Sequence, residues 1–329
     1  MNDIFNKAKA NCKSLLNTYD AKANDNRPGT FKILVISWCC ILLLFAGEIA
    51  FANSMEFSLP PGEIIFALKL LLAAQVLSFS ILATKIQDAY SVFMAIQYLA
   101  LFLFGSIFTA VTFYSSATLN FPLNDELLIK IDSLMGFDWF SYVKFVALYP
   151  RLQLAFDIGY SSMSYSIVVA ICALVMSRNT VHLQRFAIVF FVTLLATMFF
   201  ACVFPAVGFY VHFNINPAEW GIQPTAPRVH EEHLLALRNG TMHSLPKIIR
   251  GIVTFPSFHA AVGIMLVWAF HPVKYLRAFM TVLNVLLIVA APFDGGHYLI
   301  DVIGGLLITF AAILFANYII PINSNKKID

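Results

Sequence analysis

Charged residues are scarce in this sequence: Asp, Glu, Lys and Arg make up 12% of its 329 residues, whereas 60% are hydrophobic. A soluble globule of this size needs far more polar surface than such a composition supplies. The net charge is only +3, and the basic residues are scattered along the chain. The composition therefore excludes an ordinary soluble domain, argues against a nucleic-acid partner and predicts an integral membrane protein.

Cysteine is also scarce, and the five cysteines lack the spacing of a metal site. They fall in the N-terminal tail or in apolar segments, with no extracellular pair that could be oxidised: Cys12, Cys39, Cys40, Cys172 and Cys202. We therefore expect no disulfide, no metal and no other cofactor.

Long polar stretches are few, and apolar segments of about 20 residues, enough to cross roughly 30 Å of hydrocarbon, dominate the chain. The sequence predicts an all-α polytopic membrane bundle with about eight transmembrane helices. The expected spans are 31–51, 64–83, 92–113, 152–176, 184–207, 256–270, 276–293 and 298–320.

No cleavable signal peptide is expected, because the first 30 residues are polar. A short amphipathic helix on the membrane surface is predicted there instead, with Ile4, Phe5, Ala8, Cys12, Leu15 and Leu16 on its apolar face.

The distribution of Lys and Arg predicts the orientation, because cytoplasmic loops carry the excess. The N-terminal tail and the short loops near Lys85, Arg178 and Lys274 are the more basic side. Both termini are therefore expected in the cytoplasm. The long loops 114–151 and 208–255 would lie outside, together with the starts of the sixth and eighth spans.

Two histidines stand at those outer starts. His259 opens the sixth span, and His297 opens the eighth with Asp301 four residues later. On a helix, this separation puts His297 and Asp301 on one side, where a carboxylate can fix one ring nitrogen as a donor and leave the other free. A free imidazole nitrogen is a nucleophile or a base.

The same segments contain features suited to binding phosphate. Pro256 is predicted at the first helical position, after a cap at Thr254 or Phe255, so that free amides face outward. Ser257 could add a hydroxyl donor. Gly295 and Gly296 allow a tight turn and a close approach to a ligand.

At these residues the sequence resembles a known family. "PSFHAA" (256–261) and "GGHYLIDVIGG" (295–305) resemble the second and third motifs of the type 2 phosphatidic acid phosphatase superfamily, most closely its inositol phosphorylceramide synthase-like branch. The block "PLNDELLIKIDSLMGFDW" (122–139) resembles a further landmark of that branch. Ala290 and Ala291 replace the Ser-Arg pair of the lipid phosphatases, and the sphingolipid synthase branch departs from their pattern similarly.

The resemblance implies a role for each motif residue. His297 corresponds to the histidine that attacks phosphorus, Asp301 to its orienting carboxylate, and His259 to the histidine that protonates the leaving oxygen. The cations that bind phosphate are left open, with three candidates in the preceding outer loop: Arg238, Lys247 and Arg250.

The hydropathy pattern and the resemblance, which covers about residues 114–320, together imply a domain organisation. A cytoplasmic tail (1–30) and three N-terminal transmembrane helices (31–113) would precede the catalytic domain (114–320), and a second cytoplasmic tail (321–329) would follow it.

The expected function is a metal-independent phosphotransferase or phosphatase that acts on membrane lipid phosphoesters, in the plasma membrane of a bacterium. Water as acceptor would make it a lipid phosphate phosphatase; a lipid alcohol would make it a synthase. A transporter is the alternative from another class, because Glu48, Lys69 and Asp157 lie in or near spans and could mark an ion path.

For two loop segments the sequence predicts a structural role rather than a catalytic one. The run Arg228 to His233 contains two histidines and two glutamates, but it lacks a known ligand spacing, and a solvated loop is expected. The segment 123–135 predicts a helix lying flat at the outer interface, capped by Asn124, with Leu127, Leu128, Ile131, Leu134 and Met135 on one stripe.

Overall fold

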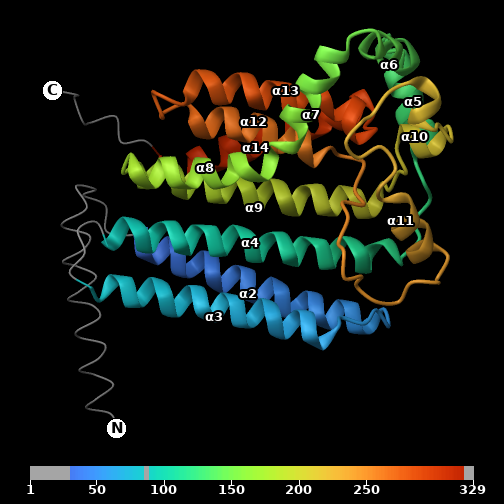
Figure 1. Cartoon of the computed structure of the whole chain (residues 1–329). Coiled ribbons are helices and arrows are strands. Elements are labelled where there is room, and N and C mark those ends of the chain that lie inside the picture. Colours follow the sequence, from blue (N-terminus) through green and yellow to red (C-terminus); the bar gives the residue numbers. More distant parts are fainter. Residues whose placement is uncertain (1–29, 85–88, 322–329) are drawn as a thin grey trace.

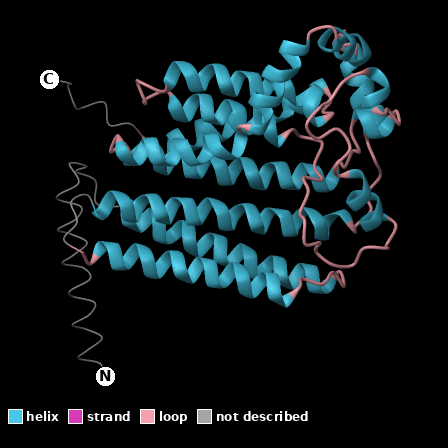
Figure 2. Cartoon of the chain, in the orientation of Figure 1, coloured by secondary structure: helices cyan, strands magenta, loops and turns pink. Residues whose placement is uncertain are grey.

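The structure is a computed structural model that describes residues 30–84 and 89–321. The amphipathic helix predicted over the first residues, and all but the start of the predicted C-terminal tail, lie outside this described part. The regular elements that it contains are helices (Figure 2). They are α2 (Thr30–Ser54), α3 (Pro61–Leu82), α4 (Ala89–Ala117), α5 (Asp125–Leu134), α6 (Trp139–Ala147), α7 (Pro150–Ser161), α8 (Met163–Met176), α9 (Thr180–Val203), α10 (Phe209–His212), the 3-10 helix η1 (Pro217–Trp220), α11 (Glu231–Arg238), α12 (Phe258–Phe270), α13 (Arg277–Gly295) and α14 (Leu299–Ile319).

The membrane helices differ in length from the eight predicted spans. Within the described residues, six helices are long and apolar enough to cross a membrane: α2, α3, α4, α9, α13 and α14. The fourth predicted span is two helices, α7 and α8, that meet at Ser162 with a bend of 53°. The sixth is the apolar helix α12, which has only 13 residues and is shorter than the six long helices. An integral membrane protein is supported, whereas a count of eight spans is not confirmed.

The long helices lie side by side in two groups. Helices α2, α3 and α4 form one group, and α9 packs on α4 next to the second group of α8, α12, α13 and α14 (Figure 1). The short helices α5, α6, α10 and α11 gather at the end where α12 and α14 begin, opposite the turn from α8 to α9 (Figure 1). This end therefore collects both predicted histidines and the two long loops.

Glycines allow close crossings within the second group. A Cβ on Gly263 of α12 would lie 2.5 Å from the Ile288 side chain of α13, and one on Gly305 of α14 would lie 2.3 Å from the Ser257 carbonyl oxygen. A Cβ on Gly159 of α7 would lie 2.8 Å from Leu286 of α13. Small residues at such crossings let helix backbones approach closely in membrane bundles. These contacts hold α7 and α12 against α13, and α14 against the start of α12.

The orientation can be tested by labelling. In a background without the five native cysteines, Asn239→Cys, at the exposed end of α11, should react with an impermeant thiol reagent in intact cells. Ser177→Cys, in the exposed turn between α8 and α9, should react only after permeabilisation. The reverse pattern would place the histidine end of the bundle in the cytoplasm.

Candidate active site

Two histidines from different parts of the chain meet at the loop end of the bundle. His259 is the second residue of α12, and His297 lies in the connection between α13 and α14. Their ring centroids are 5.9 Å apart. His297 is only 3% exposed, whereas His259 is partly exposed.

The tautomer of His297 is fixed by a backbone group. Its Nδ1 lies 2.9 Å from the carbonyl oxygen of Thr254, and a carbonyl can only accept, so Nδ1 carries the proton. Burial lowers the pKa of His297 to about 4, which keeps the ring neutral near pH 7. The other nitrogen, Nε2, therefore has a free lone pair.

Asp301 lies close to His297 but does not make the hydrogen bond predicted for it. Its Oδ2 is 3.6 Å from His297 Nδ1 and accepts from the Tyr298 amide at 2.8 Å. The predicted geometry required both residues on one helix, but α14 begins at Leu299, after His297. Asp301 is fully buried, and at this distance its carboxyl group lies beside the ring without a hydrogen bond to it.

The start of α14 is occupied by carboxylates rather than open to an anion. Asp132 of α5 accepts from the amides of Leu299 and Ile300, at 2.7 and 2.8 Å. Asp301 takes the Tyr298 amide. Side chains of the protein therefore already satisfy the first amides of α14.

Asp125 adds a third buried carboxylate to this region. It accepts from the Tyr298 hydroxyl at 2.9 Å and from the amides of Val207 and Gly208. It therefore ties the residue after His297 to the segment between α9 and α10.

Sequence reasoning missed Asp125 and Asp132 as supports of the site. Helix α5 was predicted, but its apolar stripe is mostly exposed, with Leu127, Leu134 and Met135 facing outward. Its buried residues are Asp125, Leu128 and Asp132. Asn124 forms no side-chain cap, contrary to the prediction. The spacing of Asp125, Leu128 and Asp132 places them on one face of a helix, and this pattern could have revealed the buried side of α5.

The start of α12 differs from the prediction by two residues. Ser257, not Thr254 or Phe255, is the N-cap, and its Oγ accepts from the Ala260 amide at 3.3 Å. Pro256 consequently precedes the helix. Ser257 is fully buried, and its amide donates to the Asp301 carbonyl oxygen at 2.9 Å. Its role as a phosphate ligand stays a prediction, and its observed contacts join α12 to α14.

The glycine pair forms the predicted tight turn. Gly296 ends α13 with a φ of 65°, in the left-handed region that favours glycine. A Cβ on Gly295 would lie 2.7 Å from the Tyr160 hydroxyl and 2.8 Å from Cδ2 of His297. Gly295 therefore lets the His297 ring and the Tyr160 hydroxyl come close together.

Tyr160 is a further residue that sequence reasoning missed. It comes from the last turn of α7, and its ring stacks on His259 with centroids 4.2 Å apart. Its hydroxyl lies 3.3 Å from His259 Nδ1. No spacing in the sequence relates α7 to α12, so the contact arises only from the packing of α7 on α13.

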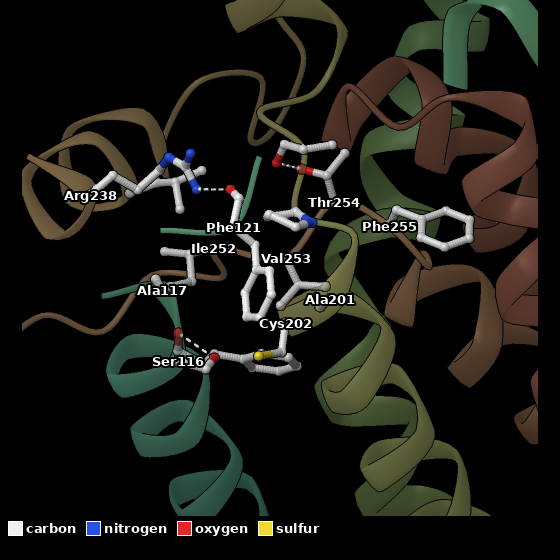
Figure 3. Close-up of a pocket in the computed structure, with 14 residues that line it drawn as sticks. Ser116, Ala117, Phe121, Ala201, Cys202, Arg238, Ile252, Val253, Thr254 and Phe255 are labelled. Carbon is white, nitrogen blue, oxygen red and sulfur yellow. Dashed lines mark hydrogen bonds between the residues drawn. The ribbon is translucent and has the colours of Figure 1, made fainter. Parts of the chain in front are cut away.

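Two of the three predicted phosphate-binding cations donate hydrogen bonds to backbone carbonyl groups. Arg250 donates to the Val229 carbonyl oxygen at 2.8 Å, and Lys247 is exposed. Arg238 donates to the Phe121 carbonyl oxygen at 2.9 Å and lines a cavity between the ends of α4 and α9 (Figure 3). This cavity has an empty volume of about 420 Å³, which includes the solvent space at its opening.

Thr254 separates this cavity from His297. It lines the cavity, and its carbonyl oxygen holds the Nδ1 side of the ring. The cavity with Arg238 therefore lies behind the group that supports His297, and not at the Nε2 lone pair. The role of all three cations in substrate binding stays a prediction.

The segment from Arg228 to His233 is not the solvated loop that was predicted. His230 and His233 are buried. His230 Nε2 lies 2.7 Å from the Val207 carbonyl oxygen, and His233 Nδ1 lies 2.7 Å from the Tyr114 hydroxyl. Arg228 forms an ion pair with Glu231 at 2.7 Å. These contacts dock α11 on α4 and on the segment after α9.

Two of the three charged residues that suggested a transporter have local hydrogen-bond partners. Glu48 is buried and accepts hydrogen bonds from Thr112 and Ser115 of α4. Asp157 accepts from the Thr225 hydroxyl at 2.8 Å. Lys69 is exposed on α3.

Comparison with known proteins identifies one family. The family model described as the PAP2 superfamily matches residues 126–315, which is more than half of the chain. The matched region contains His259, His297 and Asp301, as well as α5 from its second residue onward. No curated protein and no solved structure matches the chain significantly.

The support of α14 by α5 can be tested by mutation. Asp132→Asn removes a buried charge and at least one acceptor from two helix amides, so the free energy of unfolding should fall by about 1–3 kcal/mol. The measurement is thermal unfolding of the purified protein in one detergent. The matched control is Asp138→Asn: this exposed carboxylate also accepts from a helix amide, that of Phe140, but water can replace it. Equal losses in the two variants would contradict a specific role for Asp132.

Proposed function

The chain belongs to the PAP2 superfamily, and on that premise we propose that it is an integral membrane enzyme that cleaves a lipid phosphoester through a phosphohistidine. The observation that carries this proposal is the pair of imidazoles 5.9 Å apart, one of which has its Nδ1 committed to a carbonyl group. A neutral histidine held in this way presents Nε2 as a nucleophile.

The first step forms the bond from His297 Nε2 to phosphorus and breaks the bond from phosphorus to the lipid alcohol. The His297 ring becomes positively charged in this step. Asp301, 3.6 Å from Nδ1, would stabilise that charge. His259, protonated beside the bound anion, would give its Nε2 proton to the leaving oxygen.

The second step reverses these roles. Nε2 of His259 takes a proton from the acceptor, the acceptor oxygen bonds to phosphorus, and the bond to His297 breaks. Water as acceptor releases phosphate from a monoester donor, or a phosphomonoester from a phosphodiester donor, whereas a lipid alcohol yields a new phospholipid. The chemistry of the protein groups is the same in both cases.

The charges around the site favour a phosphodiester donor over a phosphomonoester. The three candidate cations are engaged elsewhere or exposed, while Asp294 is fully buried beside Gly295, in the turn that carries His297. A phosphodiester carries one negative charge and requires less countercharge than a monoester dianion. This supports the inositol phosphorylceramide synthase-like branch over a lipid phosphate phosphatase.

A lipid assay tests the reaction. Purified protein in detergent with excess EDTA should convert labelled phosphatidylinositol and ceramide into a new phospholipid, since imidazoles rather than a metal ion perform the proposed chemistry. Labelled phosphatidate in a parallel reaction reports phosphatase activity through free phosphate. Release of phosphate without transfer would assign the phosphatase instead. Turnover that stops in EDTA and returns with a divalent ion would contradict the metal-free mechanism.

Histidine variants separate the two proposed roles. His297→Ala should abolish turnover of every substrate because it removes the nucleophile. His259→Ala should lower turnover of a lipid ester by about 10²–10⁴-fold, but should affect p-nitrophenyl phosphate much less, since its leaving group needs no proton. Steady-state rates, and gels of samples quenched in alkaline detergent, in which phosphohistidine is stable, provide the measurements. The assignment fails if the activated ester rescues His297→Ala rather than His259→Ala.

A further inference from the structure

Tyr160, which contacts His259, has no role in the two chemical steps proposed above. Tyr160 is buried, at 7% exposure, at the end of α7. The preceding residue, Gly159, lies directly against α13, which fixes the height of this turn. The bend between α7 and α8 follows immediately after this turn. Tyr160 therefore lies at the end of a helix, in a position that the packing of α7 on α13 fixes.

The contact of Tyr160 with His259 has two parts. The rings are stacked, with an interplanar angle of 15° and centroids 4.2 Å apart. The hydroxyl also reaches His259 Nδ1 at 3.3 Å. Stacking sets the plane of the imidazole, and the hydroxyl sets its rotation within that plane.

In the resting protein, the Tyr160 hydroxyl is the donor of its hydrogen bond to His259. Within residues 30–84 and 89–321, the Tyr160 hydroxyl has no other hydrogen-bond partner. A buried O–H group needs an acceptor, so it donates to Nδ1 of the neutral ring. The ring proton of His259 is then on Nε2, whereas that of His297 is on Nδ1. The two histidines therefore rest in opposite tautomers.

A hydroxyl can serve His259 in both protonation states. It donates to Nδ1 of the neutral ring, and it can turn to accept from Nδ1–H of the imidazolium. A carbonyl group, which holds His297, can only accept. His259 must gain and lose a proton at Nε2 in the proposed reaction, while His297 must keep one tautomer throughout.

We propose that Tyr160 is the positioning residue of His259, which holds the ring in place while it exchanges a proton with the leaving and entering oxygens. This inference rests on the proposed function and assigns a group that the sequence motifs do not contain. Gly295 belongs to the same arrangement, because any larger residue there would separate the Tyr160 hydroxyl from His297.

Tyr160→Phe tests the proposal because it keeps the stacked ring and removes only the hydroxyl. The rate of phosphohistidine formation from a lipid ester should fall by roughly 10-fold or more, within the 10²–10⁴-fold that a general acid supplies. The rate with p-nitrophenyl phosphate should change by less than about 3-fold, since no proton is needed. A purely structural role would lower both rates together, and that result would overturn the proposal.

Two controls isolate the contact. Tyr142→Phe removes another tyrosine hydroxyl beside α13, one that donates to the Val289 carbonyl oxygen and not to a histidine, and it should lower both rates equally or not at all. In a His259→Ala background, Tyr160→Phe should cause no further loss with the lipid ester. Additive losses would show that Tyr160 acts independently of His259.

A spectroscopic measurement covers the case in which Tyr160→Phe does not fold. In the ¹⁵N spectrum of the histidine-labelled wild-type protein, assigned with His259→Ala and His297→Ala, the neutral His259 should be protonated at Nε2 and His297 at Nδ1. Protonation of neutral His259 at Nδ1 would overturn the proposal. Failure of the proposed function is distinguishable, because the wild-type protein would then form no phosphohistidine, whatever the tautomers.

Discussion

A helix that begins inside a protein must find acceptors for its first amide groups, and the arrangement of the site depends on how α14 meets this requirement. Asp132 and Asp301 accept from the first amides, and Asp125 holds the Tyr298 hydroxyl. Unpaired amides buried here would each cost about 1–3 kcal/mol. Because His297 directly precedes these residues, the same contacts that satisfy the helix also fix the position of the ring.

The candidate active site also depends on the N-terminal helices, which the family match does not include. Tyr114 of α4 is fully buried and lies 2.7 Å from His233 of α11. Its hydroxyl also accepts from the Arg250 amide at 3.0 Å. Residue 250 begins the segment that reaches Thr254 and then α12. Through Tyr114, helix α4 therefore supports the chain segment that leads to Thr254, whose carbonyl group orients His297.

The sequence predicted well what depends on composition and short spacing. Apolar runs located the membrane helices, and motif spacing brought attention to His259 and His297, which the structure does bring together. It did not predict contacts between distant elements: Tyr160 and Asp132 meet the site only through helix packing. The relation of His297 to Asp301 was misjudged for a local reason, because the start of α14 depends on a capping pattern that a four-residue spacing does not reveal. The apolar stripe of α5 did not reveal which side of this helix is buried, because a membrane protein can expose apolar residues.

The attachment of α5 to the site has a consequence for how its sequence can change in length. Asp125 and Asp132 are seven residues apart, close to two full turns, so both carboxylates point to the same side of the helix. One residue inserted between them would rotate one carboxylate by about 100° relative to the other and break one of the two attachments. Substitutions on the outward stripe of Leu127, Leu134 and Met135 leave this register intact. Helix α5 therefore tolerates side-chain substitutions on its outer face, but no insertion or deletion between Asp125 and Asp132.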